Sequence, residues 1–458
     1  MDYSDFLEGK ISTAKPVGFE PTRPINPMAF PFQRDMIAWS LRRGRSAEFA
    51  DCGLGKSLCE LEWASHVLDY TNSTVLVLTP LAVAKQMSRE AEKFRIDRVN
   101  VCRTADQAKS GMINVLNYER LGGLDPSMFG GIVLDESSIL KAFEGSTRKQ
   151  VTDFARRIPF RLAATATPAP NDLIELTNHS EFLDVLSGKE VIAQFFTQDG
   201  NTTQKYRLKK HAVTPFWRWL SSWSVAIRKP SDLGYDDTGF VLPELRIHET
   251  IVESGVPSGR LFASDVQSLQ ERRETRRASL SQRADATADL VNKRSYDPWI
   301  LWCDLNAEAD ALRDRLPDAV EVRGSDPVEL KEERFEAFAS GEIGTLITKP
   351  SIAGFGLNWQ HCNNMAFVGS SDSYEQQYQA IRRCYRFGQK RPVNVHFVYS
   401  DAEGTVVENV RRKERQASEM FDEIVKHMAG FSIGQQRRNH VDYVPTVPMS
   451  LPAFMEMA

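Results

Sequence analysis

The chain carries, between a strand-like run and a helix-period stretch, the sequence Ala50-Asp51-Cys52-Gly53-Leu54-Gly55-Lys56-Ser57. Gly53 and Gly55 allow the backbone to wrap around a phosphate, and the N-terminus of the next helix directs its N–H groups at the same point. Lys56 then reaches the β- and γ-phosphates of a nucleotide, and the Ser57 hydroxyl can bind Mg²⁺. Ala50 stands where the common pattern has its first glycine, so a chance glycine-rich turn is the alternative interpretation. The strand, loop and helix context favours a phosphate-binding loop, the P-loop (residues 50–57).

A pair of carboxylates follows an apolar run farther along the chain, in Gly131-Ile-Val-Leu-Asp135-Glu136. ATP hydrolysis needs one carboxylate at a strand tip for Mg²⁺ and a second one to orient the attacking water. We assign these two roles to Asp135 and Glu136. An Asp-Glu pair after a strand is alternatively a solvated turn, but its place 79 residues after Lys56 favours the catalytic interpretation.

A cluster of arginines lies in the second half of the chain, in Gln379-Ala-Ile-Arg382-Arg383-Cys-Tyr-Arg386-Phe-Gly388-Gln389. The stretch has a helical pattern, in which offsets of four and three place Gln379, Arg383 and Arg386 on one face. Two guanidinium groups reached across a cleft suit the charge that develops on a transferring phosphoryl group. The alternative is a solvated basic helix.

Strand-like and helix-period stretches alternate along two blocks of the chain. This alternation, with fully apolar strands, predicts parallel sheets covered by helices on both faces. The two blocks have similar size, which indicates an α/β fold of two similar lobes with a cleft between them. The predicted divisions are an N-terminal arm 1–27, a first, ATP-binding lobe 28–178, a mainly helical insertion or connector 179–295, a second lobe 296–425 and a C-terminal tail 426–458.

Composition limits the classes of function. The chain has 458 residues, and its 57 Lys and Arg against 61 Asp and Glu exclude the global basic charge of a histone-like or membrane-coating protein. The longest apolar stretch, residues 75–84, is well below the roughly 20 residues of a membrane span, and the acidic start of the chain is unlike a secretory signal. The six cysteines show no pair at two-residue spacing, so we interpret them as reduced and mostly buried. We expect a cytoplasmic protein with no membrane partner.

Together these motifs resemble those of the superfamily-2 helicases of the DEAD/DEAH type, and within them the Swi/Snf-like branch. Their order and spacing are kept over about residues 28–425. The matching positions are Gln33, motif I at 50–57, motif Ia at Val77-Leu-Thr79-Pro80, motif Ib at Asn117-Tyr118-Glu119, motif II at Asp135-Glu136-Ser137-Ser138, motif III at Thr165-Ala-Thr167-Pro168-Ala-Pro-Asn171, motif IV at Ile300-Leu-Trp-Cys303, motif V at Gly354-Phe-Gly356-Leu-Asn358-Trp359 and motif VI at 379–389. The runs 49–56 and 351–358 are similar to those of helicases encoded by bacteriophages and prophages.

The resemblance implies two RecA-like lobes in tandem, with ATP and Mg²⁺ held in the cleft between them. The roles that it implies are adenine recognition for Gln33, nucleotide binding for Gln379, sensing of nucleotide and DNA for Gly356, coupling of nucleotide state to lobe closure for Thr165 and Thr167, nucleic-acid contact for Thr79 and Asn358, and an arginine finger at Arg386 with Arg383 beside it. The sequence departs from the family at two points. Motif II has Ser137 and Ser138 where the family often has Ala-His, which bears on the link from Glu136 to motif III. Residues 369–374 replace the Asp…Trp-Asn-Pro segment that is common in chromatin remodellers.

A nucleic-acid surface is predicted within residues 202–231, which contain seven Lys and Arg, five aromatic residues and no Asp or Glu. Basic residues suit phosphates and aromatic residues suit bases, so we hypothesise that Lys205, Lys209 and Lys210 help to grip duplex DNA. The alternative is that Trp219 and Trp223, four residues apart, form the buried face of a helix. We interpret a second Arg-rich stretch, 272–277, as a solvated helix because Glu alternates with its arginines.

The sequence thus predicts an ATP-dependent DNA translocase or helicase that uses ATP and Mg²⁺. Its substrate is DNA, with duplex favoured over single-stranded DNA by the Swi/Snf-like features. By its resemblance, it would act in the cytoplasm of a bacterial host with a phage replication, recombination or DNA-modification protein as partner. Two alternatives stay open: an RNA helicase, and an ATP-gated DNA-binding clamp that recruits a partner through its Pro-rich ends.

Overall fold

The computed structural model describes residues 14–80, 83–141, 145–198, 206–253, 276–353, 358–369, 371 and 373–429. The predicted arm is therefore described from residue 14 onward, and the predicted tail only as far as residue 429. Two of the predicted site residues, Lys205 and Gly356, lie outside the described residues.

The first lobe is built on a seven-stranded sheet in the order β3-β4-β2-β5-β6-β1-β9, in which every neighbouring pair is parallel. Its strands are β1 (Arg45–Ala50), β2 (Thr74–Thr79), β3 (Val99–Val101), β4 (Ile113–Asn117), β5 (Phe129–Asp135), β6 (Phe160–Ala164) and β9 (Ser224–Ile227). The helices of this part of the chain are α2 (Pro31–Arg43), α3 (Lys56–Thr71), α4 (Ala84–Phe94), α5 (Ser146–Ala155), α6 (Leu176–Leu183), α7 (Gly188–Phe195) and α8 (Val213–Ser221).

Helices cover both faces of this sheet, as the apolar strands predict. Successive side chains of β2 alternate between two cores: Val75 and Val77 pack with α3 and α4 on one face, whereas Leu76 and Leu78 pack with α6 and α8 on the other. All six residues of β2 are buried. All six cysteines of the chain are free and five are buried, which confirms their interpretation as reduced small hydrophobic residues.

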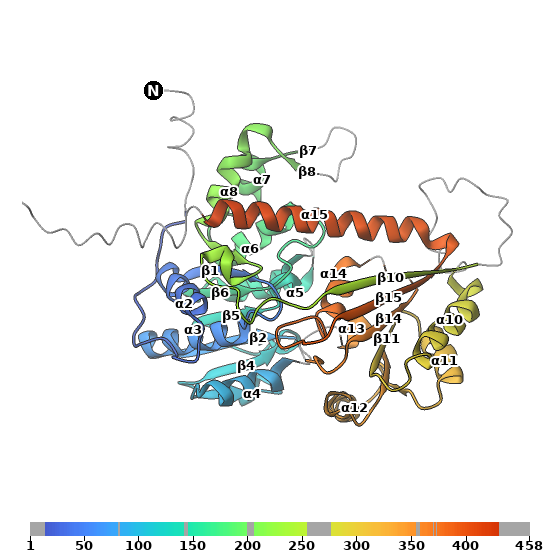
Figure 1. Cartoon of the computed structure of the whole chain (residues 1–458). Helices are drawn as coiled ribbons and strands as arrows, with labels where there is room; N and C mark the ends of the chain where they lie inside the picture. Colours follow the sequence, from blue (N-terminus) through green and yellow to red (C-terminus); the bar gives the residue numbers. More distant parts are fainter. Residues whose placement is uncertain are drawn as a thin grey trace, which may run out of the picture.

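The second lobe repeats this plan with a six-stranded parallel sheet in the order β10-β15-β14-β11-β13-β12. Its strands are β10 (Leu245–Val252), β11 (Trp299–Cys303), β12 (Val320–Glu321), β13 (Thr345–Thr348), β14 (Asn364–Val368) and β15 (Val393–Ser400). Its helices are α10 (Leu280–Asn292), α11 (Asn306–Arg315), α12 (Val328–Ser340), α13 (Pro350–Ala353) and α14 (Tyr374–Ile381). The chain therefore has the expected α/β architecture of two RecA-like parallel-sheet lobes in tandem (Figure 1).

The long helix α15 (Gly404–Ala429) joins the two lobes a second time. It begins beyond β15 of the second lobe and runs above both lobes (Figure 1). Near its end Met420, Phe421 and Ile424 enter the apolar core of the first lobe. The Arg228 guanidinium, at the end of β9, donates to the carbonyl oxygen of Ser418 at 2.8 Å. Of the helices that the structure describes, none combines the length and apolar character that crossing a bilayer requires.

The predicted insertion at 179–295 contributes an edge strand to each sheet. β9 pairs with β1 in the first lobe, and β10 pairs with β15 in the second. Between its helices lies the short antiparallel hairpin of β7 (Phe196–Gln198) and β8 (Tyr206–Leu208). The domain boundaries themselves stay predictions.

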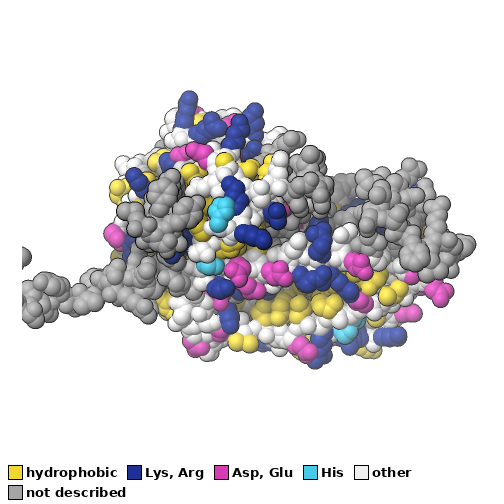
Figure 2. Space-filling view, turned by 90° about the horizontal axis from the view of Figure 1, so that it is seen from above, with side chains coloured by type: hydrophobic (Ala, Val, Ile, Leu, Met, Phe, Trp, Pro, Cys, Tyr) yellow, Lys and Arg dark blue, Asp and Glu magenta, His cyan; other side chains and the backbone are white. Residues whose placement is uncertain are grey.

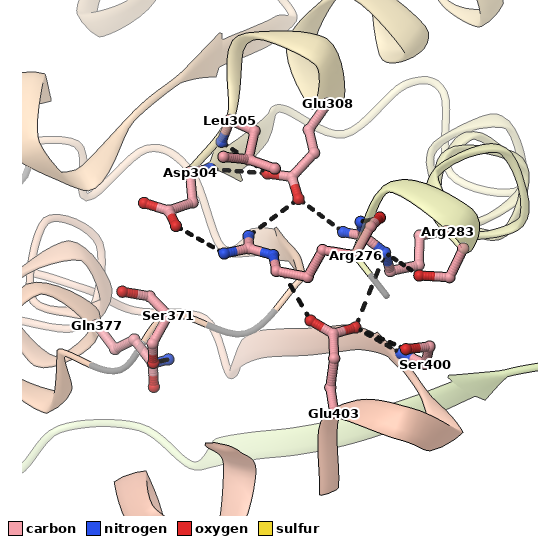
Figure 3. Close-up of polar contacts among 10 residues, drawn as sticks. Arg276, Arg283, Asp304, Leu305, Glu308, Ser371, Gln377, Ser400 and Glu403 are labelled. Atoms are coloured by element: carbon pink, nitrogen blue, oxygen red, sulfur yellow. Dashed lines mark hydrogen bonds and ion pairs between the residues drawn. The ribbon is translucent and has the colours of Figure 1, made fainter. Parts of the chain in front are cut away.

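A cluster of buried ion pairs holds α10 and the residues before it, α11 and the short turn 401–403 that precedes α15 together (Figure 3). Arg283 and Glu308 are each 0% exposed, and their Nη1 and Oε1 atoms lie 2.8 Å apart. Arg276 joins them with its Nη2 3.0 Å from the same oxygen of Glu308, and Glu403 lies 3.7 Å from Arg276. The interpretation of 272–277 as a solvated helix is therefore wrong for Arg276, because carboxylates from other elements pair with it and cover it.

Gly369 lies directly against this cluster, and we predict that Gly369→Ala lowers the free energy of unfolding by about 2 kcal/mol or more. The backbone of Gly369 has φ +98, which L side chains rarely adopt, and an added Cβ would lie 2.5 Å from Nη1 of the ion-paired Arg283. Urea denaturation measures the loss. Gly344→Ala is the matched control, because a Cβ there meets nothing within 4 Å. Equal losses for the two variants would contradict this account.

Candidate nucleotide-binding site between the lobes

The P-loop connects β1 to α3, whose first residue is Lys56. Gly53 has φ +91, and a Cβ there would lie 2.7 Å from the backbone nitrogen of Phe387 in the second lobe. The second lobe can thus approach the loop this closely only because residue 53 has no side chain. The Lys56 ammonium donates to the carbonyl oxygen of Ala50 at 3.0 Å. Burial by itself lowers the pKa of Lys56, but Cys52, Glu136 and other nearby acidic groups outweigh it and raise that pKa.

The two predicted catalytic carboxylates lie at the carboxyl end of β5, which only β6 separates from the P-loop strand β1 in the sheet. Asp135 is 5% exposed, and burial, followed by the neighbouring charge of Glu136, raises its pKa to about 7. The Thr79 hydroxyl donates to Oδ2 of Asp135 at 2.8 Å, and the Tyr118 hydroxyl donates to its carbonyl oxygen at 2.7 Å. These contacts fix Asp135 at the tip of the strand.

Glu136 contacts the predicted coupling segment directly. Its Oε2 accepts a hydrogen bond from the Thr165 hydroxyl at 3.4 Å, and the backbone N–H of Thr167 donates to the same hydroxyl at 3.1 Å. A path from Glu136 to motif III is therefore present although Ser137 and Ser138 replace the usual Ala-His. The Ser137 hydroxyl instead lies 3.1 Å from Nε2 of the buried His179 on α6.

Two further buried carboxyl groups beneath the P-loop were missed by sequence reasoning. Glu60 on α3 is 0% exposed, neither of its carboxyl oxygens has a hydrogen-bond partner among the described residues, and burial, followed by Asp135, raises its pKa well above the usual range. Glu48 on β1 is also 0% exposed, and burial raises its pKa to about 7. The sequence feature that could have indicated them is a glutamate within a stretch of mostly apolar residues, as in β1 and at the start of α3.

The predicted adenine-reading residue, Gln33, braces the P-loop. Its amide donates to the carbonyl oxygen of Leu54 at 2.8 Å and accepts from the backbone N–H of Phe30 at 2.8 Å. Phe30 and Phe387 are both partly exposed here, and each ring contacts Phe240, at centroid distances of 5.0 and 4.9 Å. Exposed aromatic rings next to a P-loop suit the flat ring of a base. Adenine recognition by Gln33 stays a prediction.

On the second lobe, Gln379, Arg383 and Arg386 are brought together, but not along one helix. α14 ends at Ile381, so the prediction that places both arginines on a helix face is wrong. After Ile381 the chain forms a turn: the backbone N–H groups of Arg383 and Cys384 donate to the carbonyl oxygens of the residues three positions earlier. The buried side chain of Gln389 stabilises this turn by donating to the carbonyl oxygens of Cys362 and Cys384.

Acidic groups of the first lobe influence the pKa of Arg383 in this turn. Burial lowers the pKa of Arg383, and Cys52, Glu136 and Asp135, all in the first lobe, oppose that change. Nη2 of Arg383 donates to the amide oxygen of Gln379 at 3.1 Å, and Arg386 donates to the side chain of Asn358. Nε2 of Gln379 and Nε of Arg386 are buried with no hydrogen-bond partner among the described residues.

These features fit a nucleotide with its metal ion. The P-loop supplies backbone donors and Lys56, and the donors of Gln379 and Arg386 that have no partner in the described part of the chain suit an anionic ligand. Within the described residues no group of three or more His, Cys, Asp and Glu could hold a metal ion alone. Mg²⁺ characteristically takes only one or two protein ligands and completes its shell with phosphates and water, so Ser57 and Asp135 would hold it together with the nucleotide.

The residues predicted to contact nucleic acid do not form one surface. The side chain of Thr79 is 0% exposed and bonded to Asp135, and Asn358 is bonded to Arg386. Nζ of Lys209 donates to the carbonyl oxygen of Ala193 at 2.6 Å, at the end of α7, whereas Lys210 is exposed. On the described part of the face that carries α15, Lys and Arg side chains are interspersed with Asp and Glu (Figure 2).

The tryptophans of 202–231 belong to the core. Trp219 and Trp223 are each 0% exposed, with ring centroids 5.3 Å apart, which confirms the buried alternative for these two residues. Tight packing around α8 and β9 uses both faces of these rings, so they are not available for stacking on bases.

Part of the second lobe is similar to a known protein family. Residues 282–388, from α10 to the turn after α14, match the helicase conserved C-terminal domain. A solved structure of the Sulfolobus solfataricus SWI2/SNF2 ATPase core in complex with dsDNA is similar at 17% sequence identity and a TM-score of 0.43, over 92% of this chain and 99% of that chain. A likeness at this level transfers neither an activity nor a substrate. No curated protein matches the chain.

The buried Glu48 predicts a specific dependence of stability on pH. Its folded-state pKa of about 7 exceeds the ordinary value of 4.5, so the folded protein holds an extra proton between these pH values and its free energy of unfolding falls as the pH rises through them. Relative to Glu48→Gln, the native chain should lose up to about 3 kcal/mol between pH 4.5 and pH 8, measured by urea denaturation. Glu92→Gln, which removes an exposed carboxylate, is the control; a difference between the native chain and Glu48→Gln that does not change with pH would overturn the prediction.

Proposed function

We propose that this chain is an ATP-dependent DNA translocase or helicase that couples ATP hydrolysis to movement on DNA. The observation that carries the proposal is the position of Arg383: it is 3% exposed, belongs to the second lobe and donates to Gln379 Oε1, which lies 3.9 Å from Sγ of Cys52 in the P-loop. The charges of Asp135 and Glu136 in the first lobe also oppose the lowering of its pKa by burial. Such an arrangement would supply donors from one lobe and carboxylates from the other to a single transferring phosphoryl group. The helicase C-terminal match over 282–388 supports the same reading of the second lobe.

The residues divide the work of hydrolysis as follows. Lys56 and the P-loop amides would bind the phosphates, and Glu136 would orient the attacking water. Mg²⁺, when bound at Ser57 and Asp135, would neutralise charge on the β- and γ-phosphates. Arg383 and Arg386 would stabilise the charge that develops during transfer.

Movement would follow from the state of the cleft. With ATP bound, contacts from both lobes favour closure, and loss of the γ-phosphate removes some of them. The hydrogen bonds from Glu136 to Thr165 and onward to Thr167 provide a route by which this change reaches the rest of the first lobe. We propose duplex DNA as the track on the resemblance to the Swi/Snf-like branch, and bacteriophage DNA metabolism as the setting on the resemblance of the runs 49–56 and 351–358 given above.

ATP hydrolysis tests the proposal. Rates are measured without nucleic acid and with duplex DNA, single-stranded DNA or RNA, for the native chain, Glu136→Gln and the control Glu329→Gln, which alters an exposed side chain of α12. We expect the highest rate with duplex DNA, a loss of at least ~100-fold in Glu136→Gln and no change in the control. Displacement of a triplex-forming strand then distinguishes translocation from simple binding.

Two outcomes would replace the proposal. Stimulation by RNA but not by DNA would favour an RNA helicase. DNA binding that depends on ATP, without hydrolysis under any condition, would favour an ATP-gated clamp that recruits a partner.

A further inference from the structure

α14 contacts the first lobe through three residues besides Gln379, whose Oε1 lies 3.9 Å from Sγ of Cys52. Glu375, Tyr378 and Arg382 follow one another at offsets of three and four, so they lie along one side of the helix and its C-cap. Glu375 forms an ion pair with Lys141, in the short helix that follows Glu136. Tyr378 and Arg382 both donate hydrogen bonds to Asp51 of the P-loop. Each residue of this face therefore reaches across to the first lobe.

The contact between Arg382 and Asp51 is a shielded ion pair. Nη2 of Arg382 lies 2.6 Å from Oδ2 of Asp51, and the two side chains are only 15% and 12% exposed. The other oxygen of Asp51 accepts from the Tyr378 hydroxyl and, at 2.6 Å, from the backbone N–H of Cys52. The Arg382 guanidinium lies over the rings of Tyr378 and Tyr385, at 5.1 and 5.3 Å from their centroids. A charge-assisted hydrogen bond in such surroundings is stronger than an exposed pair.

The two partners are adjacent in sequence to groups of the proposed reaction. Asp51 and Cys52 lead into Gly53, against which Phe387 packs, and Arg382 immediately precedes Arg383. We propose that Arg382 is a positioning residue: its ion pair with Asp51 holds the arginine-bearing turn of the second lobe against the P-loop, so that Arg383 and Arg386 meet the phosphates in a fixed register. This inference rests on the proposed function and adds to it a connection between the lobes that is made by side chains of this chain alone.

Another ion pair between the lobes provides a matched control. Arg89 on α4 pairs with Glu336 on α12, but the two side chains are 68% and 58% exposed. Exposed pairs are screened by solvent and contribute little. Arg89→Gln and Arg382→Gln therefore each remove a guanidinium group from an ion pair between the two lobes. Of these two pairs, only Arg382–Asp51 is shielded from solvent.

Hydrogen exchange of the full chain without nucleotide tests the connection independently of catalysis. In Arg382→Gln we expect the amides of residues 51–55 and 374–381 to exchange on the order of tenfold faster than in the native chain, because the turn is released from the P-loop. Arg89→Gln should exchange like the native chain. Asp51→Asn combined with Arg382→Gln should exchange no faster than the faster single variant, because both substitutions remove one shared interaction.

Steady-state ATP hydrolysis then separates positioning from a general loss of structure. Arg382→Gln should lower kcat about tenfold or more while KM for ATP changes less than about threefold, since Lys56 and the P-loop still bind the phosphates. Arg382→Lys, which keeps the charge and one donor, should recover part of kcat. If the amides of residues 51–55 and 374–381 exchange at the same rate in Arg382→Gln as in the native chain, the inference is overturned, regardless of the ATP hydrolysis rates. An absence of hydrolysis by the native chain, with accelerated exchange in Arg382→Gln, would instead overturn the proposed function and keep the connection.

Discussion

In a parallel sheet the carboxyl ends of all strands lie at one edge, and this constraint places the candidate site. β1 and β5 lead at that edge into the P-loop and the carboxylate pair, and β6 leads into Thr165 and Thr167. β6 separates β5 from β1 in the sheet, so three segments far apart in sequence become neighbours. The same geometry in the second lobe brings α14, which follows β14, to the cleft.

The close approach of the lobes depends on complementary small and charged groups. A glycine at 53 leaves room for Phe387, and the carboxylate of Asp51 receives Tyr378 and Arg382. α14 thereby serves two purposes: Glu375, Tyr378 and Arg382 attach it to the first lobe, and Gln379 lies beside Arg383 in the turn beyond the helix. α15 holds the lobes together from above by burying Met420, Phe421 and Ile424 in the first core.

Buried charge is handled differently in the two lobes. In the second lobe, Arg283 and Glu308 are buried with partners, so their desolvation is offset by short ion pairs. Beneath the P-loop, Glu48 and Glu60 are buried with few partners, and their raised pKa values show that the neutral form is favoured there. Neutral carboxyl groups reduce repulsion next to Asp135, where a nucleotide and its metal ion would add further charge.

Local sequence determined the parts of this protein that depend on neighbouring residues. Apolar strands alternating with helices predicted two parallel sheets, because a strand buried on both faces must be apolar throughout. Glycine spacing and strand-tip carboxylates likewise pointed to the P-loop, Asp135 and Glu136. Tertiary structure alone decided what depends on contacts between distant segments. It ended α14 at Ile381, buried Trp219 and Trp223, directed Lys209 and Thr79 to internal partners and paired Asp51 with Arg382. No local pattern distinguishes a basic residue that faces solvent from one that meets a carboxylate more than 300 positions away, because that choice depends on how the two lobes pack.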